Sequence, residues 1–159
     1  MTTTAPPHDR RITHVEFIHR PGERSLATRL FELLGCRVVD RGGLFFTVFV
    51  DPTVESYSTN VFYASEVTAE QWAFEQALVR SSGPDVARFA ASRRSTPQRS
   101  FHFGFRVEDD ASRAALVERV RAAADEEAFR GRLSVDGVFR PGDPGALAPN
   151  MTQVFIWTD

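Results

Sequence analysis

The chain contains no lysine, and this absence excludes two kinds of site. All 19 basic residues of the 159-residue sequence are arginine. A Schiff-base enzyme needs a lysine amine, and a P-loop uses a lysine to bind phosphate. The sequence also has no glycine run that could cradle a phosphate, so we expect no nucleotide cofactor.

Cysteine and long apolar runs are scarce as well. A single cysteine, Cys36, excludes an internal disulfide and favours a cytoplasmic protein. No apolar run approaches the roughly 18–20 residues of a membrane span. Residues 1–11 lack the apolar stretch of a secretion signal and are interpreted as a flexible tail. The net charge of -2, with no basic cluster, argues against a nucleic-acid partner.

The first part of the remaining sequence, residues 12–66, predicts a β-α-β-β-β module. Strands are predicted where β-branched and aromatic residues gather, and a helix where leucines recur at helical spacing before Gly35. The predicted elements are a strand at 12–19, a helix at 23–34, and strands at 37–40, 44–50 and 59–65.

Residues 67–99 predict a helical connector and residues 100–159 a second module. The connector contains two helical stretches, 68–80 and 84–93, broken at Gly83-Pro84. The second module predicts a strand at 100–107, a helix at 111–123 with Asp109 or Asp110 as its N-cap, and strands at 133–139 and 152–158. One of its middle strands is not evident.

The two modules are related as an internal repeat. Residues 59–66 align with 152–159, with three of eight positions identical. Residues 13–17 align with 101–105, sharing a histidine and a phenylalanine. Aligned residues differ in number by 93 in the first alignment and by 88 in the second. These differences are nearly equal, and the two aligned segments occur in the same order in each module. We therefore interpret the chain as one domain made of two similar modules.

Paired β-α-β-β-β modules with a histidine early in each first strand, here His14 and His102, resemble the vicinal oxygen chelate superfamily. This group includes glyoxalase I, methylmalonyl-CoA epimerase, extradiol dioxygenases and bleomycin-resistance proteins. The resemblance covers residues 12–66 and 100–159. It implies an α+β fold in which two curved mixed sheets form a cup around a metal or ligand, with the extra helices of 67–99 between them. It also implies a homodimer.

Within such a cup, strand alternation decides which side chains face inward. If the two histidines point in, Val15 and Phe17 of the first module pack under its helix. The residues then expected to face the cup are His14, Glu16, Asn60, Phe62, His102, Arg106, Gln153, Phe155 and Trp157.

The resemblance implies a divalent metal, Fe, Zn, Mn, Ni or Co, held by His14, His102 and Gln153, with Asn60 as a weaker candidate. Amides stand where at least one carboxylate ligand is usual, so extradiol cleavage is less favoured. Glu16 is the candidate general base, and Arg106 the candidate partner of an anionic substrate group; the two could instead form an ion pair. Phe62, Phe155 and Trp157 would form an aromatic wall.

Two functions follow from these residues. The first is a small metal-dependent enzyme, in which an ion chelates substrate oxygens for isomerase, epimerase or lyase chemistry. The alternative is a metal-free binding protein of the drug-sequestering type, whose aromatic cup holds a flat ligand. A cup filled by its own side chains is a third possibility. In the first two cases the partner is a small molecule, not a nucleic acid or a membrane.

Overall fold

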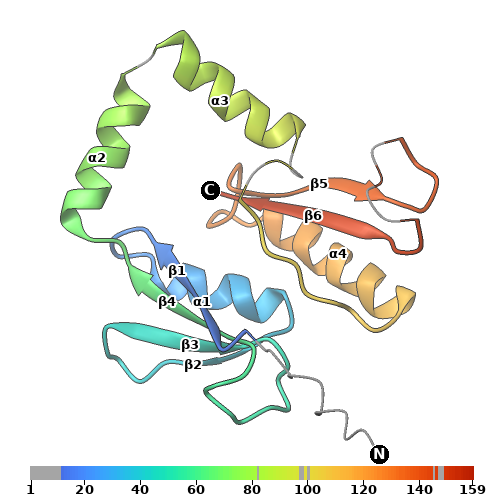
Figure 1. The fold of residues 1–159 in the computed structure, drawn as a ribbon. Coiled ribbons are helices and arrows are strands. Elements are labelled where there is room, and N and C mark those ends of the chain that lie inside the picture. The colour runs from blue at the N-terminus through green and yellow to red at the C-terminus, as the bar shows by residue number, and fades with distance from the viewer. Residues whose placement is uncertain (1–11, 82, 97–98, 100, 145, 147–148) are drawn as a thin grey trace, which may run out of the picture. The chain divides into compact units, whose positions relative to one another are not determined.

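A computed structural model describes residues 12–81, 83–96, 99, 101–144, 146 and 149–159 (Figure 1). These residues form an α+β structure with a four-stranded mixed sheet, a two-stranded sheet and four helices. The chain divides into two compact units, residues 1–67 (unit 1) and 68–159 (unit 2). The tail predicted at 1–11 lies outside the described residues.

Unit 1 has the β-α-β-β-β order predicted for residues 12–66. Its sheet has the order β1-β4-β3-β2, in which β1 and β4 are parallel and the other pairs antiparallel. The parallel pair is the first and last strand of the unit, joined through α1 and the β2–β3 hairpin. The elements are β1 (His14–His19), α1 (Arg24–Leu33), β2 (Arg37–Val39), β3 (Phe45–Phe49) and β4 (Val61–Glu66).

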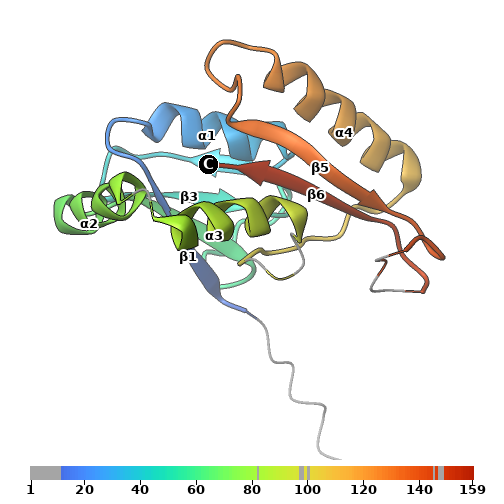
Figure 2. The ribbon, with the colours of Figure 1, turned by 90° about the horizontal axis from the view of Figure 1, so that it is seen from above.

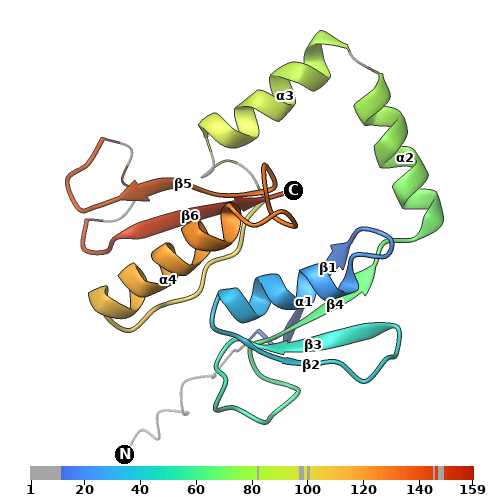
Figure 3. The same cartoon turned by 180° about the vertical axis from the view of Figure 1, so that it is seen from behind.

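Helix α1 covers one face of this sheet (Figure 3). Phe31 is the buried side chain of α1, and its ring lies 5.8 Å from Phe17 and 6.2 Å from Phe46. The helix ends in a Schellman motif: Gly35 has a φ of 87°, and the amides of Gly35 and Cys36 donate to carbonyls of the last turn. The predicted C-cap role of Gly35 is confirmed.

Cys36 follows that cap and is buried in the core of unit 1. Burial raises the pKa of its thiol to about 11, because the thiolate would lose its hydration. The thiol is therefore protonated at neutral pH and is a packing group, not a nucleophile.

Unit 2 contains three helices and a hairpin-like pair of strands. The two helices predicted between the modules are confirmed, and so is the later helix with its N-cap: the Asp109 carboxylate accepts hydrogen bonds from the amide and hydroxyl of Ser112. The elements are α2 (Ala69–Arg80), α3 (Pro84–Ser95), α4 (Asp110–Ala124), β5 (Leu133–Phe139) and β6 (Gln153–Thr158). Among the helices that the structure describes, none combines the length and apolarity required to cross a membrane.

Helix α4 packs along one face of the antiparallel β5–β6 pair (Figure 2). Val120 of α4 is fully buried, and Leu116, Val117 and Ala123 of the same helix are buried with it. Leu133 at the start of β5 completes this core. One face of the β5–β6 pair is therefore occupied by α4.

The strand predicted at 100–107 does not form over residues 101–107, the part of it that the structure describes. These seven residues have no regular secondary structure. Phe103, Phe105 and Val107 are nevertheless half-buried, while their neighbours are exposed. Alternation predicts extended backbone, but a strand also needs a hydrogen-bonding neighbour. Between β5 and β6, the residues that are described add no middle strand. Unit 2 thus shows α4, β5 and β6 of the predicted second module.

Candidate functional site

Within the described part of unit 1, helix α1 covers one face of the sheet, and no helix of the unit covers the other face. Along β1, His14, Glu16 and Ile18 are exposed, whereas Val15 and Phe17 are half-buried on the helix side. The predicted phase of this strand is confirmed. We call this surface, with the residues of β4, β3 and β2 that share it, the open face of unit 1.

His14 and Glu16 are held by neighbours on the open face. The Ser65 hydroxyl donates to a carboxylate oxygen of Glu16. The His14 ring lies 5.3 Å from the ring of Tyr63, and its Nδ1 is 3.2 Å from the Thr13 hydroxyl. The carboxylate and the imidazole are thus neighbours on one exposed strand, each with a defined contact.

Beside them the open face is hollowed. A hollow of about 270 Å³ lies over β2, β3 and β4 and the loops that follow β2 and β3. The ring of Phe45 lies 4.9 Å from that of Tyr63, so a row of three rings, His14, Tyr63 and Phe45, leads from β1 into the hollow. The lining of the hollow includes the side chains of Val39, Arg41, Phe45, Thr47, Tyr57 and Tyr63.

Arg41 is the charged residue of the hollow. Its guanidinium donates a hydrogen bond of 3.2 Å to the Tyr57 hydroxyl and lies 5.9 Å from that ring. The Tyr63 hydroxyl donates to the Tyr57 backbone carbonyl at 3.1 Å. A guanidinium held beside the Tyr57 ring, in a hollow also lined by Phe45 and Tyr63, suits a flat ligand that carries a carboxylate or another anionic group.

An ion pair fixes the loop that carries Arg41. Arg24 of α1 donates to both carboxylate oxygens of Asp40, at 2.7 and 2.6 Å, and to the Gly43 carbonyl at 2.9 Å. The Gly42 amide donates to Asp40 at 2.8 Å. The hydrogen bond from Arg24, and then that from Gly42, lower the pKa of Asp40 from its ordinary 3.8 to about 2. The same hydrogen bond raises the pKa of Arg24.

Replacement of Asp40 by asparagine should destabilise unit 1 at neutral pH by about 1 kcal/mol, because the pair is partly exposed. The pKa of Asp40 is lower in the folded than in the unfolded chain, so its contribution is complete above about pH 4 and disappears as the pH falls toward 2. Urea titrations at pH 7 and pH 3 measure this. The variant should lose less stability than the wild type between these pH values. Equal losses, or the same effect from Glu55→Gln at an exposed carboxylate, would contradict this role.

The face of β5–β6 opposite α4 carries the predicted aromatic residues of unit 2. Gln153, Phe155 and Trp157 alternate with Val154, which lies on the α4 side, so the predicted phase of this strand is confirmed. The His102 ring lies 5.6 Å from the Phe155 ring. The predicted site residue Arg106 is exposed in the segment that precedes α4.

Two predicted residues of unit 1 lie elsewhere. His14 pairs with Val61, and Val15 with Phe62, so Phe62 lies on the helix side, with its ring 5.0 Å from Phe17. Asn60 precedes β4 in a left-handed conformation with φ 51°. The prediction that Asn60 and Phe62 face the cup is therefore wrong, because the alternation of this strand is shifted by one residue. The repeat alignment matched residue types but did not fix the register against β1.

The donor set for a metal is incomplete within each unit. The described residues contain no group of three or more His, Cys, Asp or Glu side chains that could hold an ion. Unit 1 offers His14 beside Glu16, and unit 2 offers His102 and Gln153. Since a tightly held transition metal generally takes about three protein ligands or more, neither set alone fits one. The metal roles of His14, His102 and Gln153 stay predictions.

The residues that shape the hollow were missed from the sequence. Arg41, Phe45, Tyr57 and Tyr63 belong to the loops and inner strands of unit 1, which the histidine pattern did not address. The sequence did contain a signal for this site, because Phe45 and Tyr63 lie in predicted strands and Arg41 precedes the glycine pair Gly42-Gly43. No family model matches the chain, and no curated protein or solved structure matches it either. Its function must be inferred from its own residues.

Proposed function

We propose that the protein binds a small planar organic anion on the open face of unit 1. The hollow of about 270 Å³ beside Arg41 is the observation that carries this proposal. Phe45 and Tyr63 supply apolar ring surface, and Arg41 supplies a charge that its contacts with Tyr57 hold in place. This is the composition of a ligand site: mostly apolar walls with a small number of polar groups.

The size of the hollow limits the ligand. Small-molecule sites usually have volumes of roughly 300–1,000 Å³. A hollow of about 270 Å³ is therefore suited to one aromatic ring or two fused rings. A ring that lies against Tyr63 and Phe45 would direct its carboxylate toward Arg41, where two parallel hydrogen bonds are available.

The test uses 2-naphthoate as the probe and isothermal titration as the measurement. Arg41→Gln should weaken binding about tenfold, because a charge-assisted hydrogen bond is lost. Phe45→Ala should weaken it by a similar factor through the loss of ring surface. Arg29→Gln, which makes the same charge change on α1, should leave the affinity unchanged.

Three outcomes would count against this site. Binding of 2-naphthoate that is unaffected by Arg41→Gln and Phe45→Ala would place the probe elsewhere. Equal binding of the neutral analogue 2-naphthylmethanol would exclude a role for the charge of Arg41. No binding at millimolar concentrations would remove the proposal altogether.

A second candidate is a small enzyme of the vicinal oxygen chelate type, with isomerase, epimerase or lyase chemistry. Its support is the position of Glu16 and His14 on the same exposed strand, next to Tyr63 and so next to the hollow. A carboxylate oriented by a hydroxyl can remove a proton from a bound substrate. His14 is the unit 1 residue that would bind a divalent ion.

A further inference from the structure

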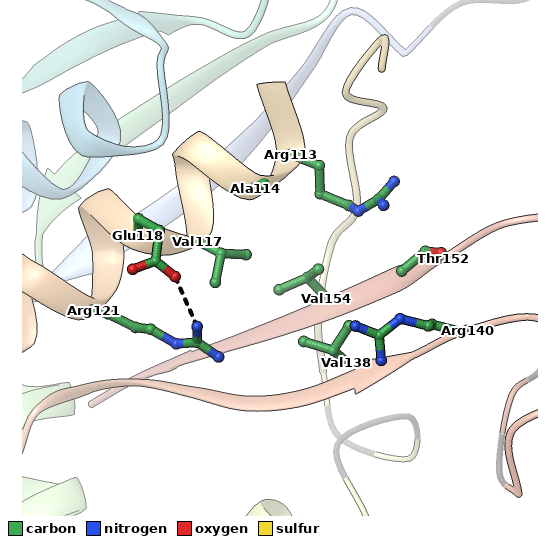
Figure 4. A pocket seen from close by; sticks show the side chains of 9 residues that line it. All are labelled: Arg113, Ala114, Val117, Glu118, Arg121, Val138, Arg140, Thr152 and Val154. Atoms are coloured by element: carbon green, nitrogen blue, oxygen red, sulfur yellow. Dashed lines mark hydrogen bonds and ion pairs between the residues drawn. The ribbon is translucent and has the colours of Figure 1, made fainter. Parts of the chain in front are cut away.

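Unit 2 has a second hollow, on the helix side of its sheet. It measures about 200 Å³ and lies between α4 and the β5–β6 pair (Figure 4). Val138 and Val154, whose side chains share the α4 side of the strands, line it, whereas Phe155 and Gln153 point to the opposite face. The lining of this hollow therefore includes neither the predicted site residues nor the residues of the hollow in unit 1.

The floor of the hollow is apolar and its rim is basic. Val117 of α4 is buried at the base, with Val138 and Val154 beside it. Arg113 and Arg121 extend from α4, and Arg140 extends from the residue that follows β5 (Figure 4). Three guanidinium groups thus surround a small apolar surface, with Glu118 as the one acidic side chain of the lining.

The positive charge of the rim is only partly balanced. Arg113 pairs with Asp110 at 2.6 Å and Arg121 with Glu118 at 2.8 Å, each within one turn of α4. Among the residues that the structure describes, the Arg140 guanidinium has no hydrogen-bond or ion-pair partner. Its backbone amide donates to the Asp143 carboxylate at 2.7 Å, which fixes the chain at the end of β5.

The two ion pairs leave the arginines available to a ligand. In the first pair Arg113 is 28% and its partner Asp110 90% exposed, and in the second pair Arg121 is 57% and Glu118 70% exposed. Exposed pairs at this spacing are weak, because water solvates both charges well. An anion that enters the hollow beside Thr152 can therefore take hydrogen bonds from Arg113 at small cost, and from Arg140 without displacing a partner among the described residues.

We propose that this hollow binds a phosphate monoester that carries a short apolar group. Guanidinium groups form bidentate hydrogen bonds with phosphate, and Arg113 and Arg140, from two elements of the fold, match a doubly charged group with three terminal oxygens. Arg121, two turns further along α4, adds positive charge on the other side of the valines (Figure 4). Thr152, also in the lining, offers a hydroxyl. The apolar group would lie on Val117, Val138 and Val154. The inference uses only unit 2 and does not depend on the proposed function.

The test measures binding of butyl phosphate by calorimetry and by amide chemical shifts. The affinity should exceed that of inorganic phosphate about tenfold, because the butyl group buries part of its surface on the valines. Arg140→Gln should lower it about tenfold, and so should Arg113→Gln. The largest shift changes should occur at the amides of Val117, Val138, Thr152 and Val154.

The control is Arg88→Gln, which removes the same charge from α3, where Arg88 is highly exposed. Its affinity should equal that of the wild type. If Arg88→Gln weakens binding as much as Arg140→Gln, the attraction is only a general effect of net charge and the site is excluded.

Tighter binding of butanoate than of butyl phosphate would overturn the choice of phosphate. If butanol binds with the same affinity as butyl phosphate, the arginines have no role in binding. If butyl phosphate does not bind at millimolar concentration, the hollow is not a binding site for it. Thermal unfolding of each variant confirms that it is folded.

Discussion

Replacement of Phe46 by alanine should lower the free energy of unfolding of unit 1 by about 3–5 kcal/mol. The Phe46 ring is 1% exposed and lies on the α1 side of the sheet. It contacts Phe31 at 6.2 Å, stacks with His19 at 6.0 Å, and lies beneath the Arg24 guanidinium at 5.6 Å. Its removal leaves a cavity between the sheet and α1 that these neighbours cannot fill. Hydrogen exchange of the β3 and β4 amides, followed in urea, measures the loss.

The adjacent residue provides a matched control. Phe45 is 48% exposed and points to the open face, so Phe45→Ala should cost well under half as much stability. The two variants should separate stability from binding, because Phe45 lines the hollow and Phe46 does not. Similar losses of stability from both substitutions would contradict the assigned strand phase.

Replacement of Glu16 by glutamine should lower proton abstraction by about 10²–10⁴-fold if the chain acts as the enzyme proposed above. The amide keeps the shape of the side chain but cannot accept a proton. The measurement is exchange of carbon-bound hydrogen into heavy water, followed by NMR. Chelating 2-oxo acids and thioesters are the test compounds, with Fe, Zn, Mn, Ni or Co supplied in turn.

Two companion variants make this result specific. Ser65→Ala leaves the carboxylate but removes the hydroxyl that orients it, so it should slow exchange by about tenfold, the scale of one hydrogen bond to a charged group. His14→Ala should abolish any dependence on added metal, whereas the control His8→Ala, which removes a histidine of the N-terminal segment 1–11, should not. Exchange at the wild-type rate in Glu16→Gln, or no exchange above buffer with any ion, would leave ligand binding as the function of the open face.

The part of the fold that was predictable is the part that depends on local patterns. Period-two alternation in 12–19 gave the face of His14 and Glu16, and leucine spacing followed by Gly35 gave α1 and its cap. The N-cap of α4 was narrowed to Asp109 or Asp110, because an aspartate side chain can satisfy amides of the first turn, and Asp109 is the one that does so. In each case the information lies within a few residues.

The parts that failed depend on partners distant in sequence. The segment 101–107 has the alternation of a strand, yet whether it joins a sheet depends on an edge that the segment itself does not encode. Phe62 was assigned to the wrong face because the register of β4 is set by pairing with β1. Both hollows were missed for the same reason, since each combines side chains from three or more separated segments.

The burial of Cys36 has a practical consequence for spectroscopy. It is the single cysteine of the chain, and its thiol is both covered by the core of unit 1 and protonated at neutral pH. Maleimides and iodoacetamide are electrophiles that react with the thiolate form of cysteine, so Cys36 of the native chain should react with them very slowly. A cysteine introduced on the surface could therefore carry a fluorophore or spin label at one known position without removal of the native residue. Distances between one such label on each unit would then report how the two units are arranged in solution.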